Sequence, residues 1–111
     1  MAQLHVDQYY RSQALTEQLG SESESVMAAF VELQERVLAT GALSIHIKRL
    51  MALGIAIALC CDNCIASAVH DALKAGATRN EIIETIGVAM LMGGAPAVSY
   101  GSEALEALNQ F

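Results

Sequence analysis

The chain has 111 residues and a mass of 11.8 kDa, the length of one domain over residues 1–111, and 54% of its residues are hydrophobic while 16% are charged. Twelve acidic and six scattered basic residues give a net charge of −6, which excludes a protein that binds nucleic acid or anionic membranes through a basic patch. This apolar content exceeds what one small core covers, so we expect an oligomer.

No basic segment followed by an apolar run opens the sequence, so no signal peptide is predicted. The longest apolar run covers residues 50–61 and is too short to span a bilayer. Three cysteines are an odd number for a disulfide scaffold, which favours redox or metal thiols in a reducing compartment. We therefore expect a cytoplasmic protein without a membrane segment.

The sequence predicts an all-α fold because it has one Pro, many Ala and Leu, and no β-type alternation. A weakly patterned first helix is expected over residues 3–19, ending at Gly20, and Ser21 with Glu24 predicts a capping box that opens the second helix. The expected helices cover residues 3–19, 21–41, 43–59, 61–76, 78–92 and 96–109. They would form a compact bundle of about six helices.

The later helices have clearer end signals. Gly76 is a good residue to end the fourth helix, and Thr78 with Glu81 predicts a capping box on the fifth. Pro96 suits the first turn of the last helix. The second half of the third helix, MALGIAIAL, is apolar on all sides and must be surrounded by protein.

Cys61 and Cys64 are three residues apart in the segment C-D-N-C, at the expected start of the fourth helix. Unpaired amide N–H groups and the positive end of the helix dipole favour a thiolate at this place. The spacing puts both sulfurs on one face, close enough to bridge, and so predicts a redox-active dithiol. One alternative is a pair of buried core cysteines. The other is a metal site, in which Cys60 and His70 would join the pair.

Residues 43–111 resemble the carboxymuconolactone decarboxylase family, in particular its AhpD-like (alkylhydroperoxidase) branch. The matching segments are ALGIAIALCCDNCIAS at 52–67 and HDALKAGATRNEIIETIGVAMLMGGAPAVSYGSEALEAL at 70–108. The resemblance implies an all-helical, AhpD-like fold whose motif-bearing core covers about 43–111, and a homotrimer or homohexamer. It also implies reduction of hydroperoxides or disulfides through the two thiols. We expect this site to use no cofactor and no metal.

The sequence departs from the branch at two positions of its motif, E-x11-C-x2-C-x3-H, in which Glu and His relay a proton to the cysteines. Counted from Cys61, the Glu position holds Arg49, and counted from Cys64, the His position holds Ala68. His70 is no replacement, because six residues of helix turn it roughly 120° away from Cys64. We therefore expect an activity weakened by the loss of the relay.

Two residues of the preceding helix are candidate auxiliaries. Arg49 would stabilise a neighbouring thiolate, although it cannot act as a base, or else it faces solvent. His46 lies one turn earlier and would be a substitute base, or else a partly exposed structural histidine. We expect His5 at the surface and Cys60 in the core rather than as a third redox thiol.

The sequence thus predicts a peroxiredoxin-type oxidoreductase, an antioxidant peroxidase or disulfide reductase with Cys61 and Cys64 as its catalytic residues. Its partners would be a hydroperoxide or disulfide substrate and a reducing dithiol. In the family's pattern Cys64 attacks and Cys61 resolves, whereas thioredoxin-like logic reverses that order. The alternative is a catalytically degenerate member that acts as a structural or small-molecule-binding oligomer. Lactone decarboxylation ranks last, because that branch needs no C-x-x-C.

Overall fold

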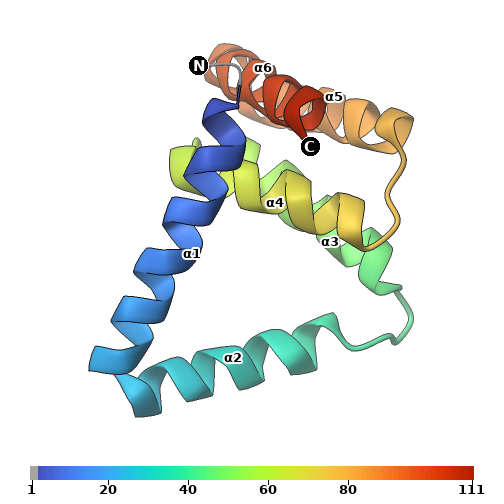
Figure 1. Cartoon of the computed structure of the whole chain (residues 1–111). Helices are drawn as coiled ribbons and strands as arrows, with labels where there is room; N and C mark the ends of the chain where they lie inside the picture. The colour runs from blue at the N-terminus through green and yellow to red at the C-terminus, as the bar shows by residue number, and fades with distance from the viewer. Residues whose placement is uncertain (1–2) are drawn as a thin grey trace.

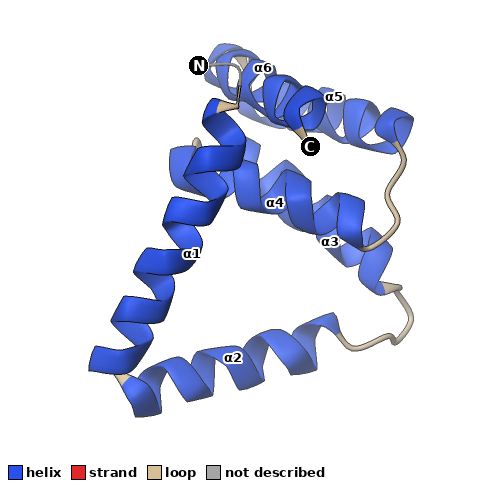
Figure 2. Cartoon of the chain, viewed as in Figure 1, coloured by secondary structure: helices blue, strands red, loops and turns tan. Residues whose placement is uncertain are grey.

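The computed structural model describes residues 3–111, and every regular element in that range is a helix (Figure 2). The helices in chain order are α1 (Leu4–Glu22), α2 (Glu24–Leu38), α3 (Ile45–Ala58), α4 (Asp62–Lys74), α5 (Arg79–Gly93) and α6 (Ala95–Gln110). The predicted all-α fold of about six helices is therefore confirmed. None of these helices is long and apolar enough to cross a membrane.

The end signals of α4 and α5 act as predicted. Gly76 has a φ of +99°, and the N–H of Ala77 donates to Ala72 O at 2.9 Å, which closes the end of α4. Thr78 Oγ1 accepts from the Glu81 N–H at 3.1 Å, and Glu81 Oε1 accepts from the Thr78 N–H at 2.8 Å. The predicted capping box is therefore present.

The predicted boundary between the first two helices is wrong. Gly20 does not end α1, which continues through it to Glu22, and the chain bends at Ser23. Ser21 lies inside α1, where its hydroxyl donates to Gln18 O at 2.8 Å instead of capping α2. A helical glycine is tolerated where neighbouring residues continue the helix, so the local signal did not decide the boundary.

The core lies among α3, α4, α5 and α6. Its largest fully buried side chains are Leu53, Ile57, Ile65, Val69 and Ile82. Small residues of α6 allow close packing, since a Cβ added at Gly101 would lie only 2.8 Å from Ile86 Cγ2 on α5. These four helices form the base of the chain, and the cysteines lie in the connection between α3 and α4 and in the first turn of α4.

Helices α1 and α2 form an arm that leaves this base (Figure 1). The start of α1 is anchored by the buried His5 and Tyr9, so the prediction that His5 lies at the surface is wrong. Helix α2 has no buried residue. The Cα radius of gyration is 14.2 Å, close to the ~13 Å of a compact chain of this length, and the arm accounts for the excess.

Candidate functional site

The turn between α3 and α4 places the cysteines. The N–H of Cys60 donates to Ile57 O at 3.1 Å and that of Cys61 to Ala56 O at 3.0 Å, the pattern of a Schellman motif. Cys60 takes the left-handed position of this motif, with a φ of +56°. It is half-buried in a turn rather than packed in the core, so the expectation of a core residue is wrong. The turn makes Cys61 the N-cap of α4 directly after α3 ends.

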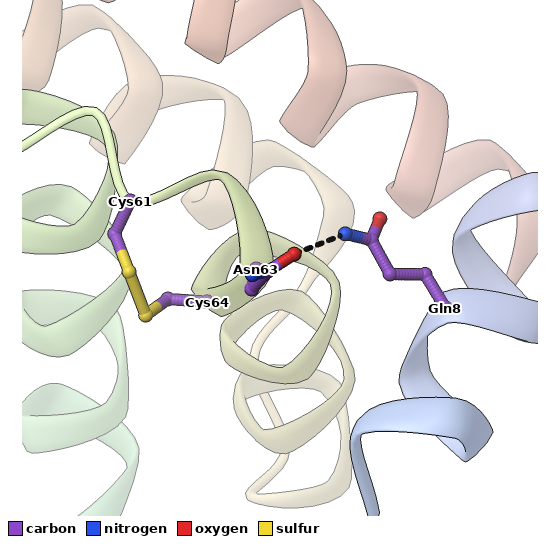
Figure 3. Close-up of a disulfide and its surroundings, with 4 residues drawn as sticks. All are labelled: Gln8, Cys61, Asn63 and Cys64. Atoms are coloured by element: carbon purple, nitrogen blue, oxygen red, sulfur yellow. Dashed lines mark hydrogen bonds between the residues drawn. A yellow bond between two sulfur atoms is a disulfide. The ribbon is translucent and has the colours of Figure 1, made fainter. Parts of the chain in front are cut away.

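Cys61 and Cys64 form a disulfide at the N-terminus of α4 (Figure 3). Their Cα atoms are 5.3 Å apart, and the Cys64 N–H donates to Cys61 O at 3.0 Å within the first turn. Cys61 is half-buried and Cys64 is exposed. The pair is therefore accessible to a reactant, which contradicts the alternative of two buried core cysteines.

Helix α1 contacts the turn that bears the disulfide. Gln8 Nε2 donates to Asn63 Oδ1 at 3.0 Å, and Asn63 lies between the two cysteines (Figure 3). The first half of α1 is thus tied both to the base and to the C-x-x-C segment. A displacement of α1 would remove this contact.

A shallow groove of about 540 Å³ runs beside the disulfide between α3 and α4. Apolar residues of α3 form much of its wall, and its polar lining residues include Arg49, Ser67 and Asp71. It is lined by Ser12, Arg49, Ala52, Ile55, Ala56, Leu59, Cys61, Asn63, Cys64, Ser67, Ala68 and Asp71. Arg49 and Ala68, the two departures from the relay motif, therefore line the same groove as the dithiol.

Arg49 is held in this groove by an ion pair that the sequence analysis missed. Its Nη1 lies 3.5 Å from Asp71 Oδ2, and both side chains are partly buried. Asp71 Oδ1 in turn lies 3.2 Å from His70 Nδ1, and the His70 ring stacks on Tyr9 with centroids 4.1 Å apart. The signal for Asp71 was its spacing, because a residue seven after Cys64 lies two turns along the same face of α4.

His46 lies at the other end of α3 from the cysteines. It is in the first turn of the helix, whereas Cys61 follows the last turn, and it does not line the groove. Its Nε2 lies 2.9 Å from Glu81 Oε1 in the capping box of α5. The Thr78 N–H lowers the pKa of the Glu81 carboxyl, and His46 lowers it further. The structure thus brings together Cys61, Cys64 and Arg49 but not His46.

The ligands of the alternative metal site are not gathered either. Among residues 3–111, the one set of His, Cys, Asp and Glu ligand atoms that lie within 4.8 Å of one another is His5, Glu103 and Glu106. Cys60 and His70 do not join Cys61 and Cys64 in such a set.

A helical base with an accessible C-x-x-C at a helix N-terminus defines an all-α dithiol protein. The model of the carboxymuconolactone decarboxylase family matches residues 24–107, and the chain belongs to this family. The AhpD-like branch is consistent with the C-x-x-C pair and its place in the fold.

The similar proteins agree with this chain in length, and the solved structures among them agree in fold. A crystal structure of an apo carboxymuconolactone decarboxylase family protein from Legionella pneumophila superposes with a TM-score of 0.92 at 33% identity, covering 96% of both chains. A structure from Thermotoga maritima gives 0.84 at 26% identity, covering 94% of this chain and 91% of that one. An uncharacterized protein of Cupriavidus necator is 33% identical over 94 residues, 82% of this chain and 83% of its own.

Proposed function

We propose that the protein is a thiol-dependent oxidoreductase that reduces hydroperoxides or disulfides through Cys61 and Cys64. The observation that carries this proposal is the position of the pair: bridged, accessible, and at the N-terminus of α4 beside a groove. The helix N-terminus favours the thiolate, which is the reactive form of a cysteine. Family membership supports the same chemistry, because the family includes AhpD-like peroxidases.

Exposure favours Cys64 as the attacking residue, since it is the more exposed of the two cysteines. Its thiolate attacks one peroxide oxygen, the O–O bond breaks, an S–OH group forms, and the alcohol leaves after taking up a proton. The Cys61 thiol then attacks the Cys64 sulfur, so that a disulfide forms and the hydroxyl leaves as water. A reducing dithiol of a partner supplies two electrons and two protons to reopen the bridge. This cycle needs no cofactor.

Arg49 and Asp71 take the place of a relay only in part. The guanidinium of Arg49 is a fixed positive charge that stabilises a thiolate or an anionic substrate group in the groove. Asp71 acts as a positioning residue, because its carboxylate holds Arg49 against the groove. Neither group replaces the missing histidine as proton donor, so we expect slow turnover.

A second candidate function is binding without turnover. It is favoured by the absence of both relay residues and by a second groove of about 400 Å³ between α3 and α5. That groove is apolar except for Thr85 and is not lined by a cysteine, with Met51, Ile55, Val88 and Met92 in its wall. A degenerate member would use such a surface for an apolar small molecule or for its own assembly.

We also propose that the chain self-associates as a homotrimer or homohexamer. The apolar stripe of α2 is exposed over its whole length and is formed by Val26, Phe30, Leu33 and Val37. Exposed apolar residues of α3 and α5 extend the uncovered surface. A second copy of the chain would cover both, as the family resemblance implies.

The test is the mass of the reduced chain before and after one equivalent of an organic hydroperoxide. We expect the mass to fall by two hydrogens and peptide mapping to show a disulfide between Cys61 and Cys64. Cys60→Ser is the matched control and should still form the bridge, whereas Cys64→Ser should not. An unchanged mass of the reduced wild type would contradict the redox proposal and favour the binding function.

A second measurement fixes the order of the thiols. In the double variant Cys60→Ser with Cys61→Ser, a sulfenic acid on Cys64 should accumulate, because no other thiol is left in the chain, and a dimedone adduct should label it. If the adduct instead forms on Cys61 in the Cys64→Ser chain, Cys61 is the attacking residue.

A further inference from the structure

We propose that His5, Glu103 and Glu106 bind a divalent first-row transition-metal ion that clamps α1 to α6. The site lies outside the dithiol groove, where the first turns of α1 pack against the second half of α6. His5 Nε2 lies 3.0 Å from Glu103 Oε2 and 3.7 Å from Glu106 Oε1. The ligand atoms of all three residues lie within 4.8 Å of one another.

The imidazole is the observation that points to an ion rather than to a cluster of surface acids. His5 is 4% exposed, and neither of its ring nitrogens makes a hydrogen bond within the described part of the chain. Burying a polar ring without a hydrogen-bond partner costs free energy, so a further partner for a ring nitrogen is expected. Nε2 is close to Glu103 Oε2, yet the oxygen does not lie along the direction of a ring N–H bond.

An oxygen that is close to Nε2 but away from the N–H direction is placed as expected for two ligands of a single ion. With bonds of roughly 2.1 Å to both atoms, a separation of 3.0 Å corresponds to an angle at the ion of roughly 90°, and 3.7 Å to one of roughly 120°. Both angles lie within the range found in four- to six-coordinate sites. A direct hydrogen bond would instead need the carboxylate oxygen near the N–H axis.

The residues around the three ligands support the arrangement. Glu103 and Glu106 are three residues apart on α6, so both carboxylates project from one face toward His5. Gln110 Nε2 donates to Glu106 Oε1 at 3.3 Å, while Gln110 Oε1 accepts from the His5 N–H at 2.7 Å. Such contacts orient ligands and are typical of the surroundings of metal sites.

The donor set selects the class of ion. One imidazole nitrogen and two carboxylate oxygens suit Zn²⁺, Mn²⁺ or Fe²⁺, whereas Mg²⁺ and Ca²⁺ prefer oxygen ligands alone. The two carboxylates are about half exposed, which leaves a path of entry and room for a water ligand. An ion there would also neutralise two like charges in an acidic chain. Because α1 carries Gln8, the clamp would hold the Gln8–Asn63 contact at the dithiol.

The experiment is calorimetric titration of the full chain with Zn²⁺ after chelator treatment, with the Cys61–Cys64 bridge oxidised and Cys60 alkylated so that no thiol binds zinc. We expect one Zn²⁺ per chain and a melting temperature that rises by several degrees. Glu103→Gln and Glu106→Gln should each weaken binding tenfold or more, because each removes a ligand. Both variants should fold, since the altered side chains are half exposed.

The matched control is Glu84→Gln, which removes an exposed carboxylate from α5 and should leave zinc affinity unchanged. Failure of the wild type to bind Zn²⁺ would overturn the proposal, as would equal affinity of Glu103→Gln and the wild type. Binding of Mg²⁺ as tight as that of Zn²⁺ would contradict the assignment of the His5 imidazole as a ligand. None of these outcomes depends on turnover at the dithiol.

Discussion

Arg49 and Ala68 stand where the AhpD-like motif has its Glu and His, and both line the groove beside Cys61 and Cys64. The exchange replaces a proton relay with a fixed positive charge and a methyl group. A fixed charge shifts the thiol equilibrium but does not transfer protons. Under the proposed function, the chemistry left to the site would be oxidation of a thiolate stabilised by Arg49, with proton transfer left to solvent.

Restoring the motif should raise the rate. We expect Arg49→Glu with Ala68→His to accelerate hydroperoxide consumption by up to ~10²-fold, the lower end of what general acid–base catalysis supplies. The residues replaced already face the dithiol groove, so the new pair would lie where the proton is needed. The measurement is peroxide consumption with a chemical dithiol as reductant, between pH 6 and 9.

The single variants are the controls. Arg49→Glu alone should slow the reaction, because it removes the positive charge and places a second carboxylate near Asp71. Ala68→His alone should give an intermediate rate. A wild type as fast as the double variant would contradict the proposal that the relay has been lost.

Cys60 and Gly76 hold equivalent places, each just after the end of a helix and each with positive φ. A side chain in this conformation brings Cβ close to the backbone, at a cost of about 1 kcal/mol. We expect Gly76→Ala to destabilise the chain by about that amount and Cys60→Gly to stabilise it by about 0.5 kcal/mol, the smaller figure reflecting the greater freedom of an unfolded glycine. Urea unfolding measures both.

Cys60→Ala separates the backbone effect from the loss of sulfur, since it keeps Cβ. It should unfold at nearly the same urea concentration as the wild type. If Cys60→Gly is less stable than Cys60→Ala, the left-handed backbone conformation of Cys60 is contradicted.

At the scale of the helix, two similar sequence signals had opposite outcomes. Ser21 with Glu24 and Thr78 with Glu81 both match a capping box, but only the second forms one. The difference lies in what precedes them. Gly76 ends α4 two residues before Thr78. In contrast, α1 continues through Ser21, so the backbone of Ser21 is helical and does not take the extended conformation of an N-cap.

The two helix ends should respond differently to the same substitution. We expect Thr78→Ala to cost about 1 kcal/mol, because the N–H of Glu81 loses its acceptor. This should lower the melting temperature by roughly 4 °C for a domain of this size. Ser21→Ala should be neutral or slightly stabilising, because alanine is the better residue inside a helix. Equal losses for both variants in thermal unfolding would mean that Ser21 also caps a helix.

At the scale of the molecule, the single chain exposes more surface than a monomer of its size should. Its accessible area is 7083 Å², against the ~5,900 Å² typical of a monomeric protein of this mass. Part of the excess comes from the α1–α2 arm that leaves the base (Figure 1). The second helix of this arm buries no side chain. An apolar arm with this much uncovered surface is typical of a subunit.

We expect the wild type to scatter light as an assembly well above 11.8 kDa at micromolar concentration. Phe30→Glu should shift it toward smaller species, because it places a charge in the exposed apolar stripe of α2. Glu32→Gln, on the same helix, is the matched control and should leave the assembly size unchanged. A single-chain mass for the wild type would contradict self-association.

Local patterns in the sequence determined the helices and the dithiol. Helix propensity, the Thr78 cap and the C-x-x-C spacing act over a few residues, so the all-α fold and the bridged Cys61–Cys64 pair followed from them. The family was also predictable, because its motif lies within one continuous segment. The boundary between α1 and α2 was predicted wrongly, since a glycine and a serine inside a helix resemble a helix boundary.

The tertiary structure decided which distant residues meet. It placed Asp71 against Arg49, paired His46 with Glu81 of α5, and buried His5 beside Glu103. These outcomes depend on how α1, α3, α4, α5 and α6 cross, and crossing angles follow from packing over the whole core rather than from any short segment. Features confined to one helix and its ends could therefore be predicted from the sequence, whereas side-chain contacts between helices could not.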